Sequence, residues 1–444
     1  MGFLDLFGGK KKEAEAQKEA QEKKEAEAKS LVERQKASHE GLGWPKPMPI
    51  SRIKTEGSSV EVMDDPISEE RKEEIGQMIF EEKISYETIR FLSLPELLFV
   101  LTALEYYNSK EKLENFSENH RTLYNELLGR IRNAENIYCL YDAATSYPFV
   151  DNGFAYIYLE KDLAEKVSEA YRRQYRKIDV KECPAHPEGA GAESKGFFDF
   201  LYYLGIEKIV IDNGRYKARF SRSEIVAPPS VIGGDDKMNP VNPALRLAML
   251  DFLSELRWPV KYEKRNENLA QKNGKMMTLA ASAKFIVPLQ YEGKADFTPD
   301  GKVKFDASTK LRFPIMKLKN GMVMLPVFTD GFEFGKRFGK DGFQGGIFGF
   351  GEILRFIQDK DGIAINPMGE NILVQKDNMA MVYASSMASN KSKILNTAPK
   401  KPMSQADMIK RASAEDVAGK IIQMPLPKAS EDKKEDADEG NDNN

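Results

Sequence analysis

The pattern of apolar and polar residues changes several times along the chain. It begins with about 40 residues that are mostly polar and charged. Residues 10–36 consist almost wholly of Lys, Glu, Ala and Gln, with many acidic and basic residues four positions apart and no apolar stripe. Such a sequence favours a solvated helix or disorder, and it gives little support to a coiled coil. We therefore predict a long polar N-terminal helix, or a disordered segment, over residues 1–40.

A short apolar segment precedes these charges. Phe3, Leu4, Leu6 and Phe7 fall on one side of a helical turn, and three lysines follow soon after. This arrangement makes the four side chains a candidate contact with an anionic membrane surface. The alternative is a segment that docks nowhere, because two helical turns bury little apolar area.

Helical periodicity begins after a proline-containing linker at residues 41–67. Apolar residues then recur three and four positions apart through about residue 108, and again over residues 118–132. Ser68 stands directly before such a pattern with acidic residues in the first turn, which is typical of a helix N-cap, and Ser93-Leu-Pro-Glu restarts a helix with the proline in its first turn. We predict a helical layer over residues 68–134 that packs on the next segment of the chain.

Short apolar strands and amphipathic helices alternate over residues 135–228. The pattern predicts the order strand, strand, helix, helix, strand, at residues 137–141, 154–159, 163–175, 196–204 and 209–214. A stretch with Pro and Gly from Cys183 to Gly191 separates the two helices, and we expect it to be a loop insertion.

The same order recurs over residues 244–376, after a linker at residues 229–243. The Asn-Gly pairs at 152–153 and 320–321 are each followed by nine residues that end in aspartate, so Asp162 aligns with Asp330 at an offset of 168 without a gap. Further on, residues 209–213 match residues 363–367 at an offset of 154, which leaves the second copy fourteen residues shorter. The chain is therefore predicted to be an α+β protein of two related modules, each a mixed sheet with flanking helices.

Four short motifs in the second copy allow a comparison with known protein families. They are Ile286-Val-Pro-Leu, Phe313-Pro-Ile-Met, Leu325-Pro-Val-Phe-Thr-Asp and Gly362-Ile-Ala-Ile-Asn-Pro-Met-Gly. Over residues 280–375 the chain resembles the N-terminal domain of the SseB family, and the copy at residues 135–228 looks like a diverged second example. The resemblance implies an α+β fold, a bacterial cytoplasmic setting and no established enzyme activity.

Composition narrows the classes of partner and compartment. The chain has 444 residues, with 66 basic and 69 acidic residues and a net charge of -3, so no overall field favours nucleic acid. Cys139 and Cys183 are too few for a disulfide framework, which fits a reducing compartment. No run of eighteen apolar residues predicts a transmembrane helix, and the N-terminus lacks the order of a secretory signal. We expect a cytoplasmic protein.

Residues that could carry chemistry are sparse. His39, His120 and His186 show no ligand spacing with one another or with the cysteines, so we expect no metal site, no cofactor and no catalytic residue. Glycines and phenylalanines alternate over residues 331–351, but their spacing fits neither a P-loop nor a dinucleotide fingerprint. We interpret this segment as a mobile helix and loop whose phenylalanines pack on the sheet. Lys336 and Arg337 keep an anionic ligand or an acidic partner segment open as the alternative.

Polar residues stand at the ends of two predicted strands of the second copy: Thr329, Asp330, Asn366 and Pro367. Such residues most often cap helices and shape turns. Loops at strand ends can also gather at one edge of a sheet as a recognition surface. These four residues, with Lys336 and Arg337, are our candidate binding loops.

The C-terminal residues 377–444 turn small and polar, with one possible helix at 404–424 and an acidic tail. Taken together, the patterns favour a non-catalytic interaction or regulatory protein that binds a protein partner. A membrane-peripheral scaffold and a sensor of a small anionic ligand remain the alternatives.

Overall fold

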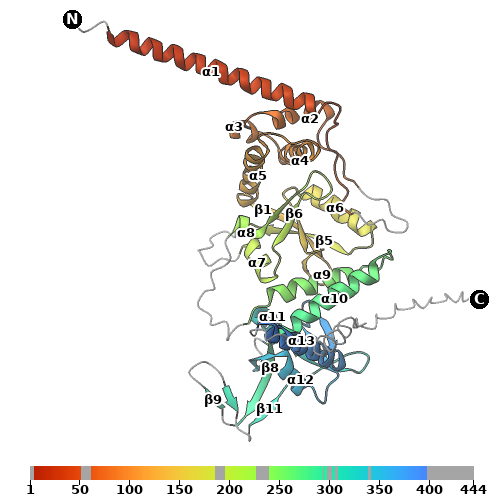
Figure 1. Ribbon diagram of the computed structural model, residues 1–444. Helices are drawn as coiled ribbons and strands as arrows, with labels where there is room; N and C mark the ends of the chain where they lie inside the picture. Colours follow the sequence, from red (N-terminus) through yellow and green to blue (C-terminus); the bar gives the residue numbers. More distant parts are fainter. Residues whose placement is uncertain are drawn as a thin grey trace, which may run out of the picture. The chain divides into compact units, whose positions relative to one another are not determined.

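A computed structural model describes residues 5–51, 62–185, 196–226, 240–293, 295–297, 303–305, 309–338 and 342–397 (Figure 1). By its internal contacts the chain divides into two units, residues 1–390 and 391–444. The helices and sheets that position the candidate site belong to the first unit. The predicted helix at 404–424 and the acidic tail lie outside the described residues, as do Phe3 and Leu4.

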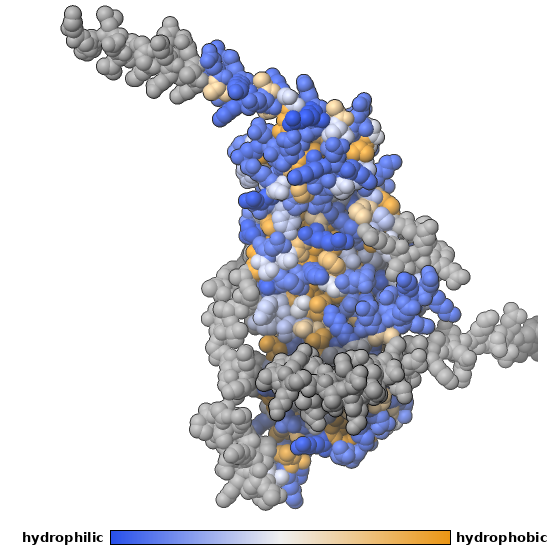
Figure 2. Space-filling model, viewed as in Figure 1, coloured by the Kyte–Doolittle hydropathy of each residue, from blue (hydrophilic) through white to orange (hydrophobic). Residues whose placement is uncertain are grey.

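The polar N-terminal segment is a helix, α1 (Asp5–Ser38). Its described surface is hydrophilic in Figure 2, but its last turns are not free in solvent. Leu31 is buried, the Gln35 side chain donates to the Phe80 carbonyl at 2.9 Å, and His39 bonds the Glu111 carbonyl at 2.9 Å. His39 therefore docks the end of α1 on the next helices. Leu6 and Phe7 lie on α1, and their side chains are outside the described part.

Five helical elements follow the connector, in which the described residues 42–51 and 62–67 form no helix or strand. Ser68 caps the first of them, as the sequence predicts, and Ser93 closes a capping box on another. The elements are α2 (Glu69–Gly76), η1 (Gln77–Phe80), α3 (Tyr86–Ile89), α4 (Leu94–Lys110) and α5 (Phe116–Arg132). Their apolar faces share one core cluster with the sheet that comes next in the chain, so the helical layer and the first module are packed together.

The first module is one mixed sheet with helices on both faces. Its strands are β1 (Asn136–Asp142), β2 (Tyr147–Pro148), β3 (Val150–Asp151), β4 (Phe154–Tyr158), β5 (Ile178–Pro184), β6 (Lys208–Ile211) and β7 (Ala218–Ser221), and its helices are α6 (Lys161–Arg173), α7 (Phe197–Tyr203) and α8 (Arg222–Ile225). Alternate strand residues face opposite clusters. Ile209 and Ile211 join the helical layer, whereas Val210 joins the cluster under α6.

The second module begins with two helices and continues with short strands. The elements are α9 (Pro243–Leu256), α10 (Arg265–Ser282), β8 (Lys284–Glu292), β9 (Ala295–Phe297), β10 (Val303–Phe305), β11 (Lys310–Arg312), β12 (Met316–Lys317), β13 (Val323–Val327), α11 (Gly331–Phe338), β14 (Gln344–Gly349), α12 (Phe350–Phe356), β15 (Gly362–Ile365), β16 (Ile372–Gln375) and α13 (Lys376–Thr397). The sequence pattern places α9 in this module alone, yet its Leu250 is buried in the first module's core. These helices and mixed sheets confirm the α+β class.

Both modules pair their strands in the same way. The first has the path β5-β1-β4-β6-β7, with β2 and β3 as short partners of β1 and β4. In the second, β14 pairs β8, the Ile286–Phe328 bridge joins β8 to the end of β13, and β13, β15 and β16 follow. The pairs β4–β6 and β13–β15 are parallel, and the other pairings in these paths are antiparallel.

The strand register corrects the alignment made from the Asn-Gly turns. The Asp212 amide donates to the Ile157 carbonyl and the Asn366 amide to the Val327 carbonyl, so Ile157 corresponds to Val327 at an offset of 170. The gap-free offset of 168 was wrong by two residues. Asn152 and Gly153 alone join β3 to β4, whereas residues 318–322 join β12 to β13, so the turns differ in length. Glu160, and not Asp162, therefore corresponds to Asp330.

Two predicted loops contain strands. Cys183 and Pro184 end β5, and the rest of that predicted insertion beyond residue 185 lies outside the described residues. Within the glycine-rich segment, residues 344–349 form β14 beside β8. A Cβ on Gly345 would lie 2.7 Å from Ile286, and one on Gly346 would lie 2.7 Å from Leu289. These glycines therefore allow the strand to pack closely on its neighbour. Their spacing in the sequence had been interpreted as a sign of mobility.

Candidate functional site

Thr329 and Asn366 meet at one edge of the second sheet. Each follows one of the parallel neighbours β13 and β15, whose carboxyl ends lie together. The Thr329 amide donates to Asn366 Oδ1 at 2.9 Å, and Asn366 Nδ2 donates to Thr329 Oγ1 at 2.8 Å. Asn366 has a φ of 48°, in the left-handed region that Asn tolerates better than most residues. The predicted convergence of these loops is thus present.

Asp330 caps the helix that follows β13. Its Oδ1 accepts from the Glu333 amide at 3.0 Å, and its Oδ2 accepts from Thr329 Oγ1 at 2.8 Å. Thr329 is fully buried and Asp330 nearly so. An acid in this position satisfies a free amide of the first helical turn. These contacts are those of a residue that caps a helix, which is the structural role that the sequence left open for Asp330.

Arg246 brings three carboxylates together under these loops. Its guanidinium enters from α9 and lies 2.8 Å from Glu370, 2.8 Å from Glu333 and 3.3 Å from Asp330. Asn366 Nδ2 also donates to Glu370 Oε2 at 2.9 Å. We call Arg246, Thr329, Asp330, Glu333, Asn366 and Glu370 the buried network.

The electrostatics of the buried network are those of a desolvated ion cluster. Burial raises the pKa of Glu370, although Arg246 opposes this by favouring the ionised form. Burial by itself would lower the pKa of Arg246, but Glu370 and the neighbouring acids raise it. The guanidinium fork can bond several carboxylates at once, so it holds these elements in one geometry.

Tyr147 links the buried network to the first module. Its hydroxyl donates to Glu333 Oε1, and Lys336 Nζ lies 2.9 Å from the same carboxylate oxygen and 2.5 Å from the Tyr147 hydroxyl. The Arg246 guanidinium also lies 4.8 Å from the centre of the Tyr147 ring. Two modules therefore meet around a single glutamate.

The two predicted cationic residues differ in their surroundings. The ammonium of Lys336 is held by Glu333 and Tyr147, which leaves it less able to bind an external anion. Arg337 is exposed, and its guanidinium lies 5.5 Å from the centre of the Phe338 ring. Pro367 is half-buried beside Met368, which is exposed.

Arg246, Glu333, Glu370 and Tyr147 were not predicted from the sequence. Arg246 carried a usable signal, because it is a charged residue within the apolar run of residues 244–250. Tyr147 carried none, because only the fold brings β2 next to α11. Hydrogen bonds and ion pairs among its own members hold the buried network together and fix both strand-end loops.

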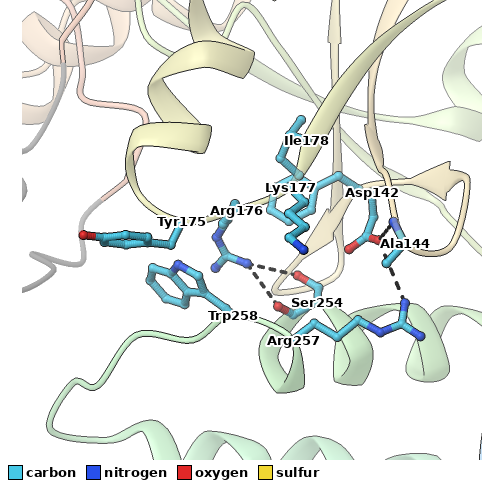
Figure 3. A pocket seen from close by; sticks show the side chains of 10 residues that line it. Asp142, Ala144, Tyr175, Arg176, Lys177, Ile178, Ser254, Arg257 and Trp258 are labelled. Carbon is cyan, nitrogen blue, oxygen red and sulfur yellow. Dashed lines mark hydrogen bonds and ion pairs between the residues drawn. The ribbon is translucent and has the colours of Figure 1, made fainter. Parts of the chain in front are cut away.

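A second polar site lies between the first module and the end of α9. The residues drawn in Figure 3 line a cavity there and come from three separate segments of the chain. The volume of the cavity is about 40 Å³. Arg176, Lys177 and Arg257 supply positive charge, and Asp142 faces them. No sequence spacing could reveal this site, because Arg257 is far along the chain from Arg176 and Lys177.

Histidine and cysteine do not form a centre in the described part of the chain. No group of three or more His, Cys, Asp or Glu residues there is arranged to hold a metal ion. Cys139 is fully buried, which raises the pKa of its thiol, and Cys183 lies 3.8 Å from the Tyr141 hydroxyl. His186 is outside the described residues. Among the described helices, none is both long and apolar enough to cross a membrane.

Comparison with known families identifies the domain that carries the strand-end loops. Residues 263–380 match the SseB protein N-terminal domain. The match confirms the resemblance expected over residues 280–375, and the SseB domain so defined runs from α10 into α13. It contains every member of the buried network except Arg246. No curated protein and no solved structure gives a significant match to the chain.

Proposed function

We propose that the chain is a non-catalytic interaction or regulatory protein, in which the strand-end loops of the SseB domain bind a segment of a protein partner. The bacterial cytoplasm is the proposed setting, on the family resemblance. The shared strand pairing further supports a duplication, with residues 135–228 as a diverged copy of the SseB domain.

The first module has a covering segment over its strand-end loop. The Met48 amide donates to the Arg215 carbonyl at 3.1 Å, and the Met63 amide donates to the Gly214 carbonyl at 3.2 Å. Between them, the Ile50 carbonyl accepts from Asn213 Nδ2 at 3.0 Å, and the Ile50 side chain is buried. Met48, Ile50 and Met63 of the connector thus use this edge of the sheet as a docking surface.

The corresponding edge of the SseB domain exposes apolar side chains. Met368 occupies the position of Gly214, where a Cβ would point at the Ile50 side chain from 2.9 Å. Met368 is 61% exposed, and Phe332, at the start of α11, is 64% exposed. This contrast between a covered edge and an apolar exposed edge is the observation that carries the proposal.

The buried network suits such a surface because it fixes both loops. Phe332 lies two residues after Asp330, and Met368 lies two residues after Asn366. Because Asp330 and Asn366 each make several hydrogen bonds, both apolar side chains project from loops that are held in place. Apolar side chains on pre-ordered loops lose little entropy on binding. The partner is therefore expected to be an extended segment with apolar side chains.

The test replaces the two exposed side chains together, as Phe332→Ser with Met368→Ser. The matched control is Tyr86→Ser with Phe91→Ser, which removes two exposed aromatic side chains from the helical layer. Proteins recovered with the tagged chain from its native host are compared by quantitative mass spectrometry. A specific partner must be lost with the first pair and retained with the second.

The proposal fails if both pairs of substitutions recover the same partners in the same amounts. Thermal unfolding of both variants accompanies the comparison, because only variants as stable as the unaltered protein make it valid. A partner that is lost can then be tested as overlapping peptides against the purified protein.

A further inference from the structure

The cavity of Figure 3 carries an inference that does not depend on the strand-end loops. We propose that it binds a small oxyanion, a carboxylate or phosphate group, between Arg176, Lys177 and Arg257. The fixed position of one guanidinium, the charge of a neighbouring ammonium that has no ion-pair partner among the described residues, and the size of the space between them support this assignment.

Arg176 is held rigidly at the wall of the cavity. Its Nη1 donates to the carbonyl oxygen of Ser254 at 3.2 Å and to its hydroxyl at 3.3 Å. The guanidinium lies 3.9 Å from the centre of the Trp258 ring and 5.1 Å from that of Phe149. The nearest carboxylate with which it pairs is Asp151, at the long distance of 3.7 Å from Nη2. A guanidinium stacked in this way is pre-ordered for an anion.

Lys177 extends its ammonium into the space between Arg176 and Asp142, as Figure 3 shows. Within the described residues it has no ion-pair partner within 4.0 Å. Arg257, on the other side, lies 3.9 Å from Asp142 Oδ1. That same oxygen already accepts the amides of Ala144 and Thr145, at 2.8 and 3.0 Å.

The charges around the cavity therefore do not cancel. Three cations face it or form its wall, against the carboxylates of Asp142 and Asp151. Two of the three cations pair with these carboxylates only at 3.7 and 3.9 Å, where an ion pair is weak. An anion of low charge would find more than one donor there.

The size of the cavity limits the ligand to a few atoms. Its volume is about 40 Å³, and one water needs roughly 10–15 Å³ on this measure, so about three water-sized atoms fit. A carboxylate group meets that limit, as do the two or three oxygens that a phosphate group would place inside, whereas a nucleotide base or a sugar does not. Such a group can belong to a free metabolite or to the carboxyl end of a peptide.

An oxyanion at this place would also act on the contact between modules. Arg257 Nη2 donates to the Glu370 carbonyl at 3.3 Å, so one of the proposed ligands of the anion also touches the buried network. An anion that draws Arg257 toward the cavity competes with that hydrogen bond. Binding is thus expected to alter the thermal midpoint as well as local signals.

The test uses the full-length protein labelled with 5-fluorotryptophan. The chain has two tryptophans, so the Trp258 resonance can be assigned with Trp44→Phe. Sodium acetate and inorganic phosphate are titrated separately, with chloride at equal ionic strength as the reference. The Trp258 resonance must move saturably with at least one oxyanion, while the Trp44 resonance does not.

Lys177→Gln is the decisive variant because it removes one charge from an exposed side chain. It is expected to weaken oxyanion binding about five- to tenfold, the loss of one charge-assisted contact. Lys166→Gln, an exposed charge on α6 outside the cavity, is the matched control and leaves the dissociation constant unchanged. Calorimetric titration of the same variants gives an independent reading.

A pair of short peptides separates the two sources of the anion. Binding of a peptide with a free carboxyl end, and not of its amidated form, identifies a chain terminus, whereas binding of phosphate alone identifies a free phosphate group. The proposal is overturned if neither acetate, phosphate nor the free peptide binds by resonance and calorimetry. It is also overturned if Lys177→Gln and Lys166→Gln bind alike.

Discussion

Asp212 and Asn366 occupy the same position in the two modules. Each follows the last residue of the parallel strand, and each donates its amide to the strand beside it, Asp212 to Ile157 at 3.1 Å and Asn366 to Val327 at 2.9 Å. Both have a positive φ, 55° and 48°. The side chains differ in chemistry only by the replacement of an amide with a carboxyl group.

The two environments treat these side chains differently. The Asn366 side chain exchanges hydrogen bonds with Thr329 and Glu370. Both carboxyl oxygens of Asp212 are buried with no hydrogen-bond partner among the described residues. Burial, with a smaller effect of Glu160, raises the pKa of Asp212 to about 8. The group is thus held as a neutral acid at neutral pH, the form closest to asparagine.

Asp212→Asn is therefore expected to change how stability depends on pH. Between about pH 4 and pH 8 the folded protein keeps a proton that the unfolded chain has released, so this residue lowers the free energy of unfolding as pH rises. The Asp212→Asn variant lacks this decrease in the free energy of unfolding. Its stability relative to the unaltered protein should grow by up to about 1.4 kcal/mol per pH unit over that interval and level off above it.

Urea unfolding at several pH values measures the difference, with the exposed Asp64→Asn as control. Equal pH profiles for the unaltered protein and Asp212→Asn would show that Asp212 is ionised in the folded state. An advantage of the amide that grows toward low pH would also contradict the prediction.

Much of the fold could be predicted because local patterns determine it. Ser93 begins α4 through a capping box that its sequence contains, and the continuous apolar run from Ile209 to Ile211 matches a strand buried on both faces. Register could not be predicted in this way. Two extra residues after the Asn-Gly pair leave that pair intact while moving every later residue, and only strand pairing reveals the difference.

Only the part of the candidate site that depends on local sequence patterns could be predicted. Thr329, Asp330 and Asn366 lie at strand ends, which sequence can identify. Arg246 and Tyr147 reach them from more than 80 residues away in the chain, and no local rule specifies such contacts. The glycine-rich stretch misled because Gly345 serves close packing against Ile286 and not flexibility.

Arg246→Met is expected to destabilise the protein by about 3–5 kcal/mol, because it leaves Asp330, Glu333 and Glu370 as a buried group of acids without their cation. Arg246→Lys keeps the charge but lacks the guanidinium fork, so its stability should lie between that of the unaltered protein and that of Arg246→Met. Lys275→Met, an exposed change on α10, is the control. Urea midpoints decide the matter, and an Arg246→Met midpoint near that of Lys275→Met would contradict the role of Arg246.

Tyr147→Phe tests the contact between the modules with the loss of one oxygen. The hydroxyl donates to Glu333 and lies beside Lys336, so its removal should cost about 1–3 kcal/mol. Amide exchange in α11 should accelerate more than exchange in α6, because Glu333 lies on α11. Tyr86→Phe, at an exposed site, serves as the control. Unchanged exchange in α11 would show that the link is not energetically significant.

Gly369→Ala tests how firmly Glu333 is held. A Cβ on Gly369 would lie 2.7 Å from Glu333 Oε2 and 3.3 Å from the Tyr147 ring. A free glutamate would move aside at little cost, but this one is fully buried and tied through Oε1 to Arg246, Tyr147 and Lys336. We expect a loss of about 1–3 kcal/mol, as for other overpacked sites.

Gly274→Ala is the matched control, because a Cβ there meets no atom within 4 Å on the exposed face of α10. It should leave stability unchanged or raise it by up to about 1 kcal/mol, since alanine favours the helix. Thermal and urea unfolding of both variants give the comparison. If Gly369→Ala proves as stable as Gly274→Ala, Glu333 must be able to leave its position, and the rigidity required of the strand-end loops would be lost with it.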